Sequence, residues 1–177
     1  MDKNSFLAFY EEAGYRVVDS FTYSDIKFFL MRNRPKTAYR VLYFAIMLLL
    51  LFFIGFMIGS MWKQTGEAGQ FWLAIGGSII FALVGCVILI PVHEFIHWLV
   101  YRNEGAADVR FGAIWRSFAF YAAAHNFLAD YKTFKRIALA PLYLLSALLC
   151  LLLLFPMPLW GKVAVALVLL FHLSSCS

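Results

Sequence analysis

Four long apolar runs fill most of the chain after residue 38. A short polar stretch separates the first two runs, a longer polar segment separates the second run from the third, and a Pro-Met-Pro sequence separates the last two. Runs of about 20 apolar residues are long enough to cross the hydrocarbon core of a bilayer as helices, and a shorter run is within the range of a span. We therefore predict an all-α integral membrane protein with four transmembrane helices, over residues 39–61, 71–101, 136–155 and 159–175.

Small residues indicate which of these helices pack closely. The first half of the second run is rich in them: Ala74, Gly76, Gly77, Ser78, Ala82 and Gly85. Because small side chains let helix backbones approach each other in lipid, we predict that this run is the tightly packed central helix. Gly55 and Gly59 in the first run have a spacing that also permits close approach, although glycine is common in such helices.

Residues 1–38 form a polar, charged head before the membrane domain of residues 39–177. A short helix ending at Gly14 is predicted near the start of the head. The segment from Ser24 to Arg32 is apolar on one side and basic at its end, so it either lies in the membrane interface or packs on the protein. No basic start followed by an apolar core is present, so no cleavable signal peptide is predicted.

Residues 102–136 are the longest polar segment after the head. Hydrophobic and polar positions alternate over part of residues 108–120, and Gly112 stands where a turn would fall. We predict a small, partly inserted β-hairpin between the second and third membrane helices.

The basic residues predict how the helices are oriented. Lys and Arg are enriched in cytoplasmic loops, and 13 of the 15 in this chain fall in residues 1–40 or in residues 102–136. Both regions, and the hairpin with them, are then cytoplasmic, and four spans with both termini inside satisfy this count. We expect a multi-pass protein of the cell membrane, with the lipid bilayer as its partner.

Composition excludes several other classes of protein. The chain is 63% hydrophobic and 14% charged, whereas a soluble domain is nearer half apolar and a quarter charged. The net charge of +5 comes from residues that flank the spans, so we expect no nucleic-acid partner. The three cysteines are scattered, without a C-x-x-C motif, and are interpreted as small buried apolar residues.

A His-Glu-x-x-His motif near the end of the second run carries the candidate chemistry. Residues four apart share a helix face, so His93 and His97 aim two imidazoles at one point and Glu94 flanks it. Two neutral imidazoles suit one zinc ion, and a nearby carboxylate can act as general base on a metal-bound water. Ionisable residues within a membrane span are costly and mark functional sites. The alternative is a polar helix end that faces water.

Pro91 lies two residues before this motif. A proline inside a helix removes one backbone hydrogen bond and kinks the helix. We expect a kink here to free a backbone carbonyl near the metal.

A catalytic zinc ion has three protein ligands as a rule, and the motif supplies two. His172 is the leading candidate for the third ligand, because it lies in the fourth run at the same predicted depth as the motif. Its alternative role is that of a polar residue hydrogen-bonded to a neighbouring backbone. His125, in the polar segment after the second run, is the fallback.

The carboxylates are weaker candidates for the third ligand. Glu104 follows the motif, but Gly105 beside it indicates a helix end in water. Asp108 and Asp130 are interpreted as solvated loop carboxylates. No Asp or Glu follows Asp130, so the last two spans contribute none.

These features resemble the zincin peptidase family DUF3267, which occurs largely in bacteria of the Bacillus type and is similar in layout to site-2 intramembrane metalloproteases. The resemblance covers roughly residues 70–177. It rests on His-Glu-Phe-Ile-His, Arg110-Phe111-Gly112, the stretch from Tyr131 to Pro141, and the ending His172-Leu173-Ser174-Ser175.

The resemblance implies that His93 and His97 are metal ligands and that Glu94 is the catalytic base. Relatives carry an acidic residue shortly after the small residues that close the last span, and the sequence ends at Ser177, where that residue would be about to appear. The third ligand is then either that acidic residue or His172.

We expect a membrane-embedded zinc metallopeptidase with one Zn²⁺ ion, which cleaves a membrane-associated peptide or protein near the cytoplasmic face. Phe111, Gly112 and Ala113 of the predicted hairpin are expected to hold the substrate as an added strand. The alternative is a non-catalytic membrane scaffold or regulator whose site is vestigial or senses a metal. A transporter is less favoured, because the spans offer no other charges for an ion path.

Overall fold

A computed structural model of the chain describes residues 37–114 and 119–175, together with residues 8, 11, 12 and 14 of the head. Residues 8, 11 and 12 are helical, and Gly14 has a positive φ of 85° that suits the predicted helix end. The prediction for Ser24 to Arg32 lies outside the described residues. Residues 1–44 and 45–177 form two separate compact units, and the account below concerns the second.

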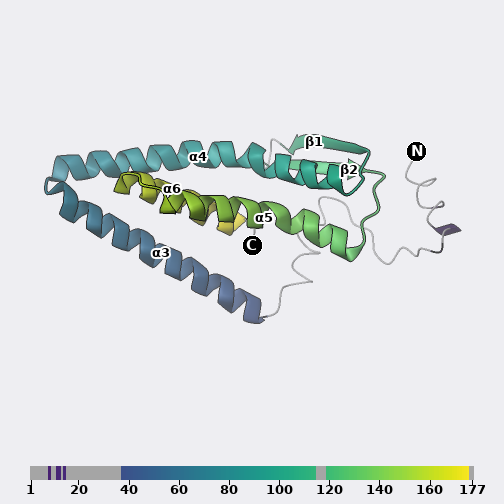
Figure 1. The fold of residues 1–177 in the computed structure, drawn as a ribbon, viewed down its shortest axis with the longest axis horizontal. Helices are drawn as coiled ribbons and strands as arrows, with labels where there is room; N and C mark the ends of the chain where they lie inside the picture. The colour runs from purple at the N-terminus through teal and green to yellow at the C-terminus, as the bar shows by residue number, and fades with distance from the viewer. Residues whose placement is uncertain (1–7, 9–10, 13, 15–36, 115–118, 176–177) are drawn as a thin grey trace. The chain divides into compact units, whose positions relative to one another are not determined.

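Four helices and one hairpin make up the described part of the chain from residue 37 onward (Figure 1). Three of the helices are long and apolar enough to cross a membrane, which supports the multi-pass prediction, and α6 is a shorter apolar helix. The 36 residues of α4 span about 54 Å, well beyond the hydrocarbon core, so one or both of its ends extend out of the core. The elements are α3 (Thr37–Thr65), α4 (Ala68–Asn103), β1 (Asp108–Ile114), β2 (Ala119–His125), α5 (Tyr131–Leu154) and α6 (Leu159–Ser175).

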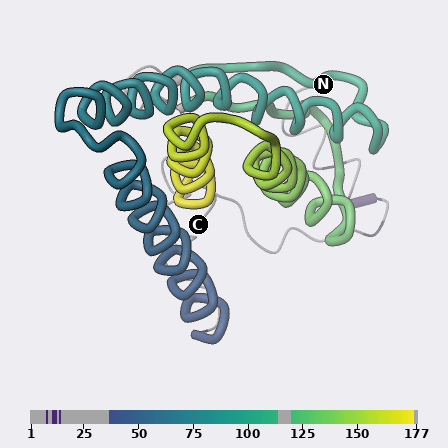
Figure 2. The backbone as a smooth tube through the Cα atoms, turned by 60° about the vertical axis from the view of Figure 1, so that its left-hand side comes forward, coloured from purple at the N-terminus to yellow at the C-terminus, as the bar shows by residue number. Residues whose placement is uncertain are grey.

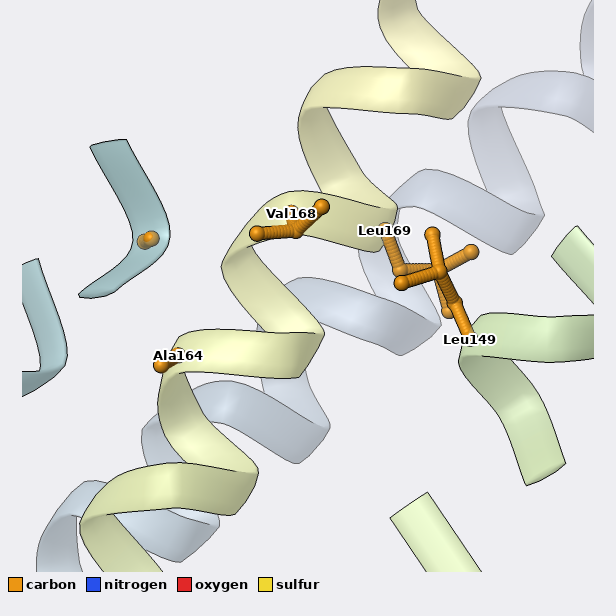
Figure 3. Close-up of a cluster of buried hydrophobic side chains, with 5 residues drawn as sticks. Leu149, Ala164, Val168 and Leu169 are labelled. Carbon is orange, nitrogen blue, oxygen red and sulfur yellow. The ribbon is translucent and has the colours of Figure 1, made fainter. Parts of the chain in front are cut away.

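The shortest of these helices, α6, lies at the centre of the packing (Figure 2). Ala166 of α6 is fully buried and packs with Ile54 of α3, while a second cluster joins α6 to Ala82 of α4 and Leu149 of α5. Figure 3 shows Leu149 and the α6 side chains of this second cluster. Most large apolar side chains of α3 face outward, as expected where lipid replaces water.

The prediction of a central second helix was therefore only half right. A Cβ at Gly76 or Gly77 would meet nothing within 4 Å, whereas a Cβ at Gly85 would lie 2.8 Å from Val168 Cγ2 of α6. Ser78, which is buried, lies 2.9 Å from the carbonyl oxygen of Trp160 in α6. Only some of the small residues of α4, Ser78, Ala82 and Gly85, mark the turns that touch α6, and the shorter helix is the enclosed one.

The spacing of Gly55 and Gly59 in α3, which would permit close approach, does not mark a close helix contact within the described residues. A Cβ added at Gly55 or Gly59 would meet nothing within 4 Å. The α3 residues that contact α6 are larger ones, Ile54 and Met57. Glycine spacing alone therefore did not identify the face of α3 that packs.

The predicted hairpin is confirmed, and its turn lies elsewhere than expected. β1 and β2 pair antiparallel, with Phe111 opposite Ala122 and Gly112 opposite Tyr121. Gly112 therefore lies inside β1, and the connection between the strands falls in residues 115–118, outside the described residues. The physical reason for glycine here is steric, because a Cβ would lie 2.3 Å from Cζ of the Tyr121 ring.

Local interactions explain the polar residues between α4 and α5. Gly105 has a φ of 94° and ends α4, and Glu104 forms an ion pair of 2.7 Å with Arg136. Asp130 caps α5 by accepting a 2.7 Å hydrogen bond from the Thr133 backbone, which lowers the pKa of Asp130. The expectation that α4 ends at Gly105 is confirmed.

The close contact between α4 and α6 yields a test of this packing. We predict that Gly85→Val lowers the free energy of unfolding by about 1–3 kcal/mol, because the new side chain overlaps Val168. The double variant Gly85→Val with Val168→Ala should recover part of the loss. Thermal unfolding in detergent measures both effects. Additive losses in the double variant would contradict the predicted contact.

Candidate metal centre

The two motif histidines lie one turn apart on α4, with ring centroids 4.9 Å apart. His172 of α6 is fully buried, and its ring centroid lies 5.8 Å from that of His93. Three imidazoles around one tetrahedral zinc have centroids about 5 Å apart, given a Zn–N distance near 2 Å. The packing of α4 against α6 thus brings a third imidazole next to the motif.

These side chains do not form a closed three-ligand site. Among residues 37–114 and 119–175, no group of three His, Cys, Asp or Glu side chains is arranged to hold a metal ion. The ring spacings on both sides of His93 are nonetheless close to those of a shared zinc, and imidazole nitrogen is a preferred zinc donor. The donor set therefore fits a zinc ion that binds His93 and His97 and draws in a third ligand.

A backbone carbonyl of α5 orients the second motif histidine. Nδ1 of His97 lies 3.0 Å from the carbonyl oxygen of Ile137. A carbonyl can only accept a hydrogen bond, so this contact requires the proton on Nδ1 and leaves the lone pair on Nε2. Metal-bound histidines commonly donate their other ring nitrogen in this way.

The carboxylate of the motif reaches the hairpin. Oε2 of Glu94 accepts a 2.8 Å hydrogen bond from the backbone N–H of Ala122 in β2. This N–H therefore points away from β1, to the outer edge of β2, and by strand alternation Ala124 presents its backbone groups to the same edge. Among the described strands, none pairs with that edge. The candidate base thus lies against an edge of the sheet that could accept another strand.

Two cavities meet at Glu94. One, of about 380 Å³, is lined by His93 and His172 among others. The other, of about 510 Å³, is mostly apolar and lies between α4 and the hairpin, where Phe111 and Gly112 border it. One carboxylate therefore borders both the histidine cluster and an apolar space large enough for side chains of a bound peptide.

The other predicted candidates lie at separate places. His125 ends β2 opposite Asp108, and Asp108 forms a 2.7 Å ion pair with Arg110. The Arg110 guanidinium lowers the pKa of this carboxyl. Ala113, expected with Phe111 and Gly112 to hold substrate, pairs with Phe120 in the hairpin register, and Phe120 borders both cavities.

Sequence reasoning missed the backbone groups of the site. The carbonyl of Ile137 and the N–H of Ala122 carry no signal in the residue types that bear them. Pro141 did carry a usable signal, because a helical proline leaves the carbonyl four residues earlier without its usual donor.

Comparison with known families gives one match. A family model, DUF3267, described as "Putative zincin peptidase", matches residues 86–177. The chain belongs to this family. The matched part begins before the motif and includes the hairpin, α5 and α6. No curated protein and no solved structure gives a significant match. Zincins are zinc enzymes, so family membership implies zinc as the metal.

The contact between Gly112 and Tyr121 yields a test of the hairpin beside the site. We predict that Gly112→Ala loosens the hairpin, because the added Cβ would force the Tyr121 ring to move. Hydrogen exchange of the β1 and β2 amides should accelerate about 5-fold or more, as for a local loss of about 1 kcal/mol. The matched control is Gly161→Ala, whose Cβ would meet only Met157 at 3.5 Å. Unchanged exchange in Gly112→Ala would contradict the contact.

Proposed function

We propose that the protein is a membrane-embedded zinc metallopeptidase that cleaves membrane-associated polypeptides near the cytoplasmic face. One observation carries the proposal: a His-Glu-x-x-His motif, in a family of zincin peptidases, has its first histidine ring 5.8 Å from a buried third imidazole. His93 and His97 would hold the ion, with His172 as the third ligand in this chain.

The chain's own groups have separate roles in the proposed reaction. Zinc, when bound, supplies Lewis-acid polarisation of the scissile carbonyl and of a water molecule. Glu94 takes a proton from that water as general base and then transfers it to the nitrogen of the leaving amine. Its Oε2 is held by the Ala122 N–H, which leaves Oε1 for this transfer.

The hairpin is proposed to bind the substrate as an extended strand. A peptide bond within a helix is not accessible, so the substrate must be unwound before cleavage. The outer edge of β2 offers backbone hydrogen bonds for such a strand, and the edge begins where Ala122 meets Glu94. Substrate side chains would enter the apolar cavity that Phe111 and Gly112 border.

The orientation belongs to the same proposal. The basic residues cluster in the head and around the hairpin, which the positive-inside rule assigns to the cytoplasm, together with both termini. The motif would then lie at the cytoplasmic end of α4, where water reaches it.

A non-catalytic scaffold or regulator, with a metal-sensing or vestigial site, is the second candidate. The observation that favours it is that no three metal-binding side chains form a closed site among residues 37–114 and 119–175. Such a protein would cleave nothing, and one with a vestigial site would also bind zinc weakly or not at all.

The role of Glu94 yields the first test of this proposal. We predict that Glu94→Gln lowers cleavage of a single-span reporter peptide in proteoliposomes by at least about 10²-fold, because it removes the general base. Zinc content, measured by atomic emission, should stay near that of the wild type. The matched control is Glu104→Gln, whose carboxylate pairs with Arg136 away from the motif, and it should cleave normally. Cleavage by Glu94→Gln at the wild-type rate would refute the mechanism.

The third ligand yields the second test. We predict that His172→Gln weakens zinc binding more than the roughly 10–100-fold that loss of an outer-shell partner costs, because a direct ligand is lost. His125→Gln is the control and should bind zinc as the wild type does. Competition with a chromophoric chelator measures both affinities. An equal affinity in both variants would exclude His172 from the site.

A further inference from the structure

A proline lies in the middle of α5, close to backbone groups that contact the histidine cluster. Pro141 is the eleventh residue of α5, which continues unbroken from Tyr131 to Leu154, and its side chain is fully buried. Proline inside an ordinary helix costs about 3 kcal/mol or more, because it has no N–H to donate and its ring collides with the carbonyl four residues earlier. In membranes such prolines persist where other groups satisfy that carbonyl.

The carbonyl that Pro141 leaves without a helical donor is that of Ile137. An α-helix joins the N–H of each residue to the carbonyl oxygen four residues before it, and residue 141 has no N–H. The group that lies 3.0 Å from this oxygen is Nδ1 of His97. The ring of the proline also pushes the carbonyl away from the helix axis, towards a partner outside α5. The imidazole of α4 therefore occupies the place of the missing N–H.

The same turn of α5 contacts the second cluster member. The backbone of Leu142 and of Pro141 lies next to the ring of His172. Two histidines on two different helices thus lie against backbone groups within six residues of α5. Anchoring by backbone sets the ring positions by the geometry of the helix and not by a flexible side chain.

We propose that Pro141 is a positioning residue for the metal centre. Because Pro141 has no N–H, the Ile137 carbonyl is left to accept a hydrogen bond from His97. This hydrogen bond fixes the Nδ1–H tautomer of His97 and directs the Nε2 lone pair away from α5. The expected effect of Pro141 on zinc affinity rests on the proposed zinc site, whereas its expected effect on the His97 tautomer does not depend on zinc. A proline that served only to bend or pack α5 would leave the tautomer of His97 unchanged when it is replaced.

The test is ¹⁵N NMR of histidine-labelled, zinc-free protein in detergent micelles. His97 in the wild type should show the nitrogen shifts of an Nδ1–H imidazole. In Pro141→Val, which keeps most of the side-chain volume, the restored N–H competes for the Ile137 carbonyl, and His97 should become a mixture of tautomers. Pro141→Ala is the second variant and should give the same mixture. Leu145→Ala, which deletes a buried side chain one turn later, should leave the tautomer unchanged.

Zinc affinity is the second readout, measured by chelator competition. Both Pro141 variants should bind zinc about 10–100-fold more weakly than the wild type, as expected for loss of an outer-shell partner, and Leu145→Ala should not. A wild-type His97 with its proton on Nε2 would overturn the proposal. So would a pure Nδ1–H tautomer in either folded Pro141 variant, even with weakened zinc binding. A wild type that binds no zinc would instead refute the zinc peptidase, while the tautomer result would still decide the role of Pro141.

Discussion

Hydrogen bonds between side chains of α4 and the backbone of its neighbours hold this membrane domain in register. Ser78 bonds the carbonyl of Trp160 in α6, Glu94 accepts the N–H of Ala122 in β2, and His97 bonds the carbonyl of Ile137 in α5. In lipid the apolar side chains supply little force between helices, and an unsatisfied polar group is costly. One helix therefore contacts each of three other elements through a polar contact as well as through packing.

This arrangement places the candidate chemistry at two of the three contacts, whereas the Ser78 contact lies about four turns earlier in α4. Two of the three polar contacts are made by motif residues. The same hydrogen bonds therefore position the motif and join α4 to α5 and to the hairpin. Glu94 lies between the cavity that contains His93 and His172 and the apolar cavity beside the hairpin. A single carboxylate thus borders both the proposed metal site and the proposed substrate site, as a general base must.

The sequence predicted the parts of the fold that depend on composition along the chain. The four helices lie within a few residues of the apolar runs, and the hairpin lies in the polar segment between the second and third runs. Gly112 was misread because glycine is common both in turns and at places where a neighbouring ring needs space. The pairing of Gly112 with Tyr121 is a contact between two strands, and the local sequence pattern around Gly112 does not show it.

The candidate site was predictable to the same degree. His93, Glu94 and His97 follow from helical spacing, and the approach of His172 follows from the predicted depth of the fourth run. Their backbone partners did not follow, because any residue type carries the same carbonyl and N–H. We expected Pro91 to free a carbonyl near the metal, and the described contact instead involves the carbonyl released by Pro141. Choosing between the two prolines required the packing of α5 against α4.

X-ray absorption at the zinc edge, on the purified full chain with one equivalent of zinc, tests the central claim most directly. The account predicts one zinc per chain, with two or three imidazole nitrogens at about 2.0–2.1 Å and an oxygen from water in the remaining position. Zinc that retains only water and buffer ligands, or that binds with sulfur from the cysteines, would contradict it.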